Sequence, residues 1–125
     1  MNMKQILFST LVILTLVSCG SSGTESAPTE KSPTASTNPD YQKGLALVSK
    51  SNCFTCHKID EKLVGPSYRE IANKYASQSD AVEALGEKVV KGGSGVWGTV
   101  PMLAHPEISK DDAELMVKYI LLLKK

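Results

Sequence analysis

The stretch Cys53-Phe54-Thr55-Cys56-His57 decides the fold of this 125-residue chain. Two residues separate its thiols, and an imidazole follows the second thiol directly. On one turn of chain, this spacing lets both sulfur atoms reach neighbouring points on the edge of a single planar ligand, while the next residue directs its imidazole at the centre of that ligand. The stretch therefore predicts a site at which two thiols and one ring nitrogen hold the same group.

Three kinds of site use a CxxC pair, and the rest of the chain separates them. A structural zinc ion needs four protein ligands; apart from Cys19, the chain offers only these two cysteines, His57 and His105, whose spacings suit zinc poorly. A thioredoxin-like redox pair belongs in a βαβ setting, and no alternating strand pattern occurs here. CxxCH is the attachment pattern of covalent haem. We therefore predict one haem c, joined by thioethers to Cys53 and Cys56, with His57 as the proximal iron ligand.

A second donor is expected on the opposite side of the iron, and the candidates are Met102, Met116 and His105. Met116 lies on the predicted inner face of the last helix, where core packing explains it. Met102 follows Pro101 in an irregular loop, so we predict Met102 as the sixth ligand and keep His105 as the alternative. A His/Met pair fills both axial positions and raises the reduction potential relative to a His/His pair. This arrangement favours electron transfer over oxygen or peroxide chemistry.

The first 18 residues have the pattern of a signal peptide. Lys4 supplies a positive charge, and residues 6–17 form a mostly apolar run, shorter than the roughly 20 residues that span a bilayer. The run ends in Leu16-Val17-Ser18-Cys19, which resembles a bacterial lipobox and implies that Cys19 is acylated as the mature N-terminus. A plain secretory signal with an incidental cysteine is the alternative. We expect an exported lipoprotein, anchored to a membrane and facing the periplasm or the cell exterior.

Residues 19–39 are rich in Ser, Thr, Gly and Pro and contain no long apolar side chain. Such a segment cannot bury enough surface to offset the entropy of ordering. We therefore predict a flexible, lipid-anchored tether, with a spacer of no specific role as the alternative. Removal of residues 1–18 takes away Lys4 and leaves equal numbers of acidic and basic residues. A neutral chain gives no indication of nucleic-acid binding.

Residues 40–125 contain four stretches with helical periodicity and N-cap signals. They run from Asp40, as N-cap, to about residue 50; from Tyr68 to about residue 76, opened by Pro66 and Ser67; from Asp80 to the glycines at 92 and 93; and from Ser109 to the chain end. The inward residues expected on the last helix are Leu115, Met116, Tyr119, Ile120, Leu122 and Leu123. The predicted class is all-α, and a core with so few aromatic residues would be completed by a large apolar ring system.

The stretches CFTCHKIDEKLVGPSY (53–68), KGGSGVWGTVPM (91–102) and ISKDDAELMVKYIL (108–121) resemble the class I bacterial cytochromes c of the small c-551/c-552 type. The resemblance covers residues 40–125. It implies one cytochrome c domain with the class I cytochrome c fold, in which four helices are wrapped around one covalently attached haem.

The resemblance also implies roles for residues around the haem. The carbonyl of Pro66 would accept a hydrogen bond from the free ring nitrogen of His57. Trp97 would pack at the haem edge and donate its indole N–H to a propionate, and Lys88 stands where the family often has a basic residue near a propionate. A plain core aromatic and a solvated surface lysine are the alternatives for these last two residues.

Three further positions bear on the packing of the first helix and on the surroundings of the Met102 sulfur. Gly44 on the first helix would allow close crossing by the last helix near Tyr119. Val48 replaces an aromatic residue of many relatives, which predicts less firm packing of the first helix. His105 stands three residues after Met102, where the family often has an amide that donates to the sulfur; it would donate the same bond or face solvent.

Together these features predict a one-electron carrier and not an enzyme. The leading interpretation is a monomeric, membrane-tethered shuttle of a respiratory chain. Its electron donor would be of the quinol:cytochrome c oxidoreductase type, and its acceptor a terminal oxidase or reductase. The alternatives are a permanent electron-entry subunit of a larger oxidase or dehydrogenase complex, and a haem sensor or weak peroxidase, which requires Met102 to leave the iron.

Overall fold

Four α-helices and one short 3-10 turn form the regular structure of residues 37–125, the part of the chain that the computed structural model describes. In chain order they are α2 (Pro39–Lys50), η1 (Cys53–Thr55), α3 (Tyr68–Tyr75), α4 (Ala81–Lys91) and α5 (Lys110–Leu121). Within these residues there is no β-strand, only an isolated bridge between Gly93 and Met102, so the all-α class is confirmed. The expected signal peptide, Cys19 and the tether up to residue 36 lie outside the described residues.

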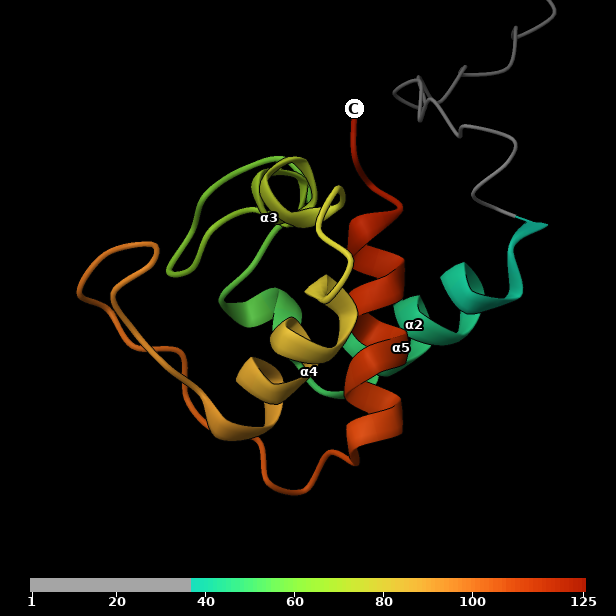
Figure 1. The fold of residues 1–125 in the computed structure, drawn as a ribbon. Coiled ribbons are helices and arrows are strands. Elements are labelled where there is room, and N and C mark those ends of the chain that lie inside the picture. The colour runs from blue at the N-terminus through green and yellow to red at the C-terminus, as the bar shows by residue number, and fades with distance from the viewer. Residues whose placement is uncertain (1–36) are drawn as a thin grey trace, which may run out of the picture.

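Helix α5 is the hub of the fold, because it packs against α2, α3 and α4. Figure 1 shows α5 running through the middle of the molecule, while the segment between α4 and α5 loops away from the helices. The buried residues of α5 are Ala113, Met116, Val117, Tyr119 and Ile120. All of them except Val117 belong to one core cluster with Val48 of α2 and Tyr68 of α3. No helix within residues 37–125 is long and apolar enough to cross a membrane.

The start of α2 differs from the expectation. Asn38, not Asp40, is the N-cap, because the side-chain oxygen of Asn38 accepts a hydrogen bond from the backbone N–H of Asp40 at 2.9 Å. Pro39 then occupies the first helical position, where its missing N–H leaves no partner unsatisfied. The helix therefore begins two residues earlier than an N-cap at Asp40 would imply.

The end of α5 also differs from the expectation. The helix stops at Leu121 instead of continuing to the chain end, and Leu122 is 43% exposed, so its predicted inward orientation is wrong. The carbonyl of Leu123 accepts a hydrogen bond from Arg69 of α3 at 2.6 Å. The N–H groups of Leu123 and Lys124 donate to the carbonyls of Ile120 and Leu121, so a tighter turn replaces the α-helical pattern at the chain end.

Ser67 and Glu70 form a capping box at the start of α3. Ser67 Oγ accepts from the Glu70 backbone N–H at 3.2 Å, and Glu70 Oε2 accepts from the Ser67 backbone N–H at 2.8 Å. The Ser67 bonds hold the pKa of Glu70 below its ordinary value of 4.5. Because the folded-state pKa is the lower one, this stabilisation is present above about pH 4.5 and is lost as the pH falls through the folded-state pKa.

Of the two remaining predicted caps, one forms and one does not. Ser109 caps α5 by accepting a hydrogen bond from the backbone N–H of Asp112 at 3.1 Å, as expected. Asp80 precedes α4 but makes no side-chain cap bond, so its carboxylate does not satisfy the first N–H groups of that helix.

The close crossing of α2 and α5 depends on Gly44. A Cβ atom added at Gly44 would overlap the Leu115 carbonyl oxygen and the Cβ of Tyr119. Tyr119 is fully buried there, and the Tyr41 ring packs edge-on against it with a centroid distance of 5.0 Å. The close approach of the first and last helices is therefore confirmed.

We predict that Gly44→Ala destabilises the haem-loaded protein by about 1–3 kcal/mol, the usual cost of overpacking a core. Guanidinium unfolding monitored by visible absorption measures this change. Gly86→Ala on α4 is the matched control, because its added Cβ would come close only to the flexible Glu114 side chain, at 3.2 Å, and would meet the α5 backbone at ordinary contact distances of 3.6 and 3.8 Å. We expect its effect to stay within about 1 kcal/mol. Equal stability of the two variants would contradict the crossing argument.

Candidate haem-binding site

The two thiols and the imidazole are brought together by the turn η1. Asn52 at its start has a positive φ of 56°, which lets the chain reverse after α2. The N–H groups of Cys56 and His57 then donate to the Cys53 carbonyl at 3.2 and 3.0 Å. Both thiols are free, Cys53 being partly buried and Cys56 exposed. Burial raises the pKa of the Cys53 thiol.

The His57 ring is held on two sides. Its Nδ1 donates a hydrogen bond to the Pro66 carbonyl at 2.7 Å. Its face stacks on the Tyr68 ring, with a centroid distance of 5.4 Å and an interplanar angle of 14°. With Nδ1 engaged, Nε2 is the nitrogen that remains to bind a metal. This is the hydrogen bond that the resemblance implies for Pro66, and the stacking on Tyr68 is a contact that the sequence analysis missed.

Gly65 lies directly against this imidazole. A Cβ atom at Gly65 would overlap the His57 ring, coming within 2.9 Å of the position of Nδ1. The Gly65 N–H donates to the Cys56 carbonyl at 2.9 Å, which closes the loop back onto the thiols. Only glycine fits here, and the sequence signal was the Gly-Pro pair that precedes the Ser67 cap.

Met102 has a fixed backbone although it lies in an irregular segment. Its N–H donates to the Gly93 carbonyl at 2.8 Å, and its carbonyl accepts from the Gly93 N–H at 3.1 Å. Three residues later, the His105 N–H donates to the carbonyls of Val89 and Val90. The ring of His105 is engaged by Glu107, with an Nδ1–Oε1 distance of 3.1 Å.

Trp97 and Pro66 line the same hollow, whereas Lys88 does not. The hollow has a volume of about 350 Å³ and is formed by residues 62–66 and 97–100. Trp97 is partly buried there, and Lys74 of α3 lies over its ring, a contact that the sequence analysis missed. The exposed Lys88 instead reaches toward Gly93, with Nζ 3.4 Å from where a Cβ of that glycine would stand.

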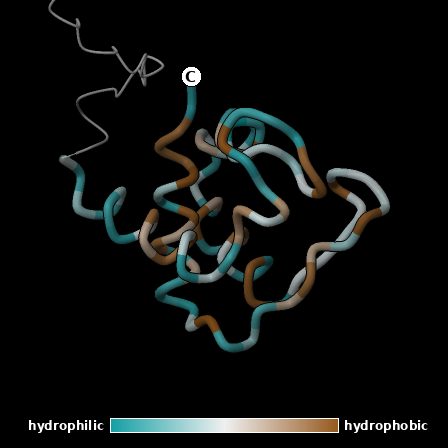
Figure 2. Tube along the Cα trace, turned by 180° about the vertical axis from the view of Figure 1, so that it is seen from behind, coloured by the Kyte–Doolittle hydropathy of each residue, from teal (hydrophilic) through white to brown (hydrophobic). Residues whose placement is uncertain are grey.

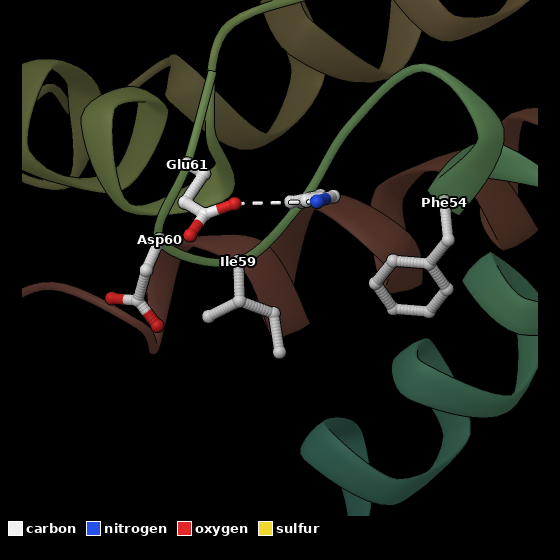
Figure 3. A pocket seen from close by; sticks show the side chains of 5 residues that line it. Phe54, Ile59, Asp60 and Glu61 are labelled. Atoms are coloured by element: carbon white, nitrogen blue, oxygen red, sulfur yellow. Dashed lines mark hydrogen bonds and ion pairs between the residues drawn. The ribbon is translucent and has the colours of Figure 1, made fainter. Parts of the chain in front are cut away.

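A second hollow of about 350 Å³ lies over Phe54, Lys58, Ile59, Asp60 and Glu61. Figure 3 shows the Phe54 and Ile59 side chains pointing the same way, with Asp60 turned away from them. Lys58 and Glu61 form an ion pair at 3.2 Å on its rim. None of these lining residues is a Cys, His or Met, so this hollow offers no sulfur or imidazole ligand.

Comparison with known proteins agrees with this geometry. The profile of the family described as cytochrome c matches residues 41–124. The chain belongs to the cytochrome c family. Cytochrome c-552 of Nitrosomonas europaea is 44% identical to this cytochrome over 83 residues, which are 66% of this chain and 81% of that protein. Cytochrome c-551 of Azotobacter vinelandii is 40% identical over 80 residues, which are 64% of this chain and 96% of that protein.

Solved structures show the same fold. The crystal structure of wild-type Nitrosomonas europaea cytochrome c552 matches with a TM-score of 0.62 at 42% identity, covering 64% of this chain and 99% of that chain. The predicted class I fold and the c-551/c-552 type are confirmed. This cytochrome therefore binds one covalent haem c with a His/Met ligand pair and carries electrons, and it is not an enzyme.

The residues present fit such a group. Two loops surround the site, residues 57–66 and 92–108. They carry five of the six exposed large hydrophobic residues of residues 37–125, which are Leu63, Val64, Val96, Val100 and Leu103. Figure 2 shows hydrophobic stretches on both loops, away from the helical core. Apolar side chains in contact with a porphyrin would lose exposed surface. The donor set also fits, because two free thiols stand next to an imidazole whose second nitrogen is available.

We predict that Gly65→Ala displaces the His57 ring and lowers the amount of haem-loaded protein, because the new methyl group would occupy the space of the imidazole. The ratio of haem absorption to protein mass in purified material measures the loss. Glu61→Gln, an exposed change in the same loop, is the control and should load haem normally. Full haem content in Gly65→Ala would contradict the argument that only glycine fits beside the His57 ring.

Proposed function

We propose that Cys53 and Cys56 hold the haem through two thioethers and that His57 Nε2 and the Met102 thioether are its axial ligands. When bound, the haem supplies an iron centre that accepts and releases one electron. The observation that carries the assignment is the His57–Pro66 hydrogen bond beside two free thiols, at 2.7 Å. It orients the imidazole, selects the tautomer and increases the basicity of Nε2.

The proposed ligands have complementary roles. The thioether of Met102 favours ferrous iron and raises the reduction potential relative to a second imidazole. Both side chains come from backbone segments closed by hydrogen bonds, so the ligands need not move when the charge of the iron changes. With both axial positions filled, no site remains for oxygen or peroxide. We also propose that Trp97 and Lys88 serve the propionate edge, as the resemblance implies.

We propose further that this cytochrome is a lipid-anchored shuttle of a respiratory chain. Support comes from the signal-peptide pattern of residues 1–18, the lipobox ending at Cys19 and the polar segment 19–39. Bacterial cytochromes c are exported proteins, and a tethered domain can reach more than one membrane-bound partner. With zero net charge after removal of residues 1–18, electrostatic steering is weak. Docking would then use the exposed apolar residues around the site.

We predict that Met102→Ala opens one axial position. The reduction potential should fall strongly, and the ferrous protein should bind CO, which wild type should not. Visible spectra during a redox titration, followed by addition of CO, measure both effects. Met116→Leu is the matched control, because Met116 is buried in α5 and its replacement keeps the apolar volume. A ferrous Met102→Ala protein that excludes CO would disprove the ligand assignment.

We predict that Cys19→Ser releases the protein from the membrane fraction into the soluble extract. Thioether-linked and amide-linked acyl chains each add about 0.8 kcal/mol per buried methylene, and the serine cannot accept the thioether-linked chains. Intact mass of the wild-type protein should show Cys19 as the acylated first residue. Retention of Cys19→Ser in the membrane fraction, with an unmodified wild-type mass, would contradict the anchor.

A further inference from the structure

Trp97 lies in a segment without a helix or strand of its own. Gly95 and Gly98 on either side of it have positive φ angles of 95° and 122°. Although its neighbours in sequence are exposed, the Trp97 side chain is partly buried. Among the described residues, its ring contacts come from the C-terminal end of α3, from Lys74 and Tyr75. These two residues therefore connect the glycine-rich loop to the helical core.

The ammonium group of Lys74 lies over two aromatic rings. Its Nζ is 5.0 Å from the ring centroid of Trp97 and 5.6 Å from that of Tyr75. Both distances are within the range of cation–π attraction, about 6 Å. The Tyr75 ring also packs edge-on against Trp97, with a centroid distance of 6.4 Å. No carboxylate in residues 37–125 forms an ion pair with Lys74, so its charge is not neutralised by a neighbour.

Lys88 does not share this position. Its Nζ lies near Gly93, five residues further along the chain. Within the part of the chain that the structure describes, no cation–π contact joins Lys88 to Trp97. Of the two lysines, Lys74 is the one in contact with the indole.

We propose that Lys74 is a positioning residue for Trp97 and supplies a fixed positive charge at the propionate edge of the haem. The proposal rests on the proposed function, in which Trp97 lies at that edge. Lys74 holds the indole in the orientation that donates its N–H toward the carboxylate. Its charge also opposes the extra positive charge of the oxidised iron, which raises the reduction potential.

The single tryptophan of the chain makes this contact measurable. The indole N–H of Trp97 gives one NMR signal, and its rate of exchange with water reports how firmly the ring is held. We compare haem-loaded wild type with Lys74→Met, which keeps the length of the side chain and removes its charge, and with Lys74→Arg, which keeps the charge. Lys43→Met is the matched control, because it removes one exposed lysine from α2.

In Lys74→Met we expect indole exchange to be about two- to fivefold faster, as fits the loss of an exposed cation–π contact. The reduction potential should also fall below that of wild type. Lys74→Arg should restore both properties, and Lys43→Met should change neither. Wild-type indole exchange in Lys74→Met would overturn the positioning role, and a wild-type potential would overturn the role of the charge.

The two readouts also separate this proposal from the ligand assignment. Indole exchange reports the Lys74–Trp97 contact whichever residue binds the iron. If Met102→Ala excludes CO while Lys74→Met speeds indole exchange, the ligand assignment fails and the Lys74 contact is upheld. If CO binds to Met102→Ala and indole exchange in Lys74→Met is unchanged, the Lys74 proposal fails by itself.

Discussion

The hydrogen bond from His57 Nδ1 to the Pro66 carbonyl joins two points that are nine residues apart. It decides which ring nitrogen carries hydrogen, and therefore which one can bind iron. Gly65 makes the bond possible, because any side chain there would occupy the space of the imidazole. Tyr68, which begins α3, covers the face of the ring. The position of the proposed ligand is thus tied to the helical core rather than to the loop alone.

The helical core and the loops of the site have different roles in the fold. The other helices pack against α5; Tyr119 is fully buried there, and among the described residues its hydroxyl has no protein hydrogen-bond partner. Burial raises the pKa of Tyr119 to about 12, so this phenol stays neutral. The two loops of the site, residues 57–66 and 92–108, are anchored to this core by a few backbone hydrogen bonds. Their exposed apolar residues are the part of the domain that a bound porphyrin would complete.

Short-range features of the structure could be predicted from the sequence. Ser109 was recognised as a cap, and Ser67 as part of the opening of its helix, because a hydroxyl reaches a backbone N–H three residues ahead, a contact that depends on local sequence only. Asn38 was missed because the apolar pattern begins later than the helix does. Leu122 was misplaced because helical periodicity continues to the chain end, whereas the helix ends at Leu121 in a tighter turn, next to a hydrogen bond from Arg69 of α3.

The sequence by itself determined the chemistry of the site: two thiols and an imidazole within five residues, and a methionine in an irregular loop, require no knowledge of packing. Tertiary structure decided which side chains surround these groups. Lys74 and Trp97 are 23 residues apart, yet one lies over the other, whereas Lys88, nearer in sequence, does not contact the indole. Such contacts depend on how helices pack against one another, and local propensities carry no information about that packing.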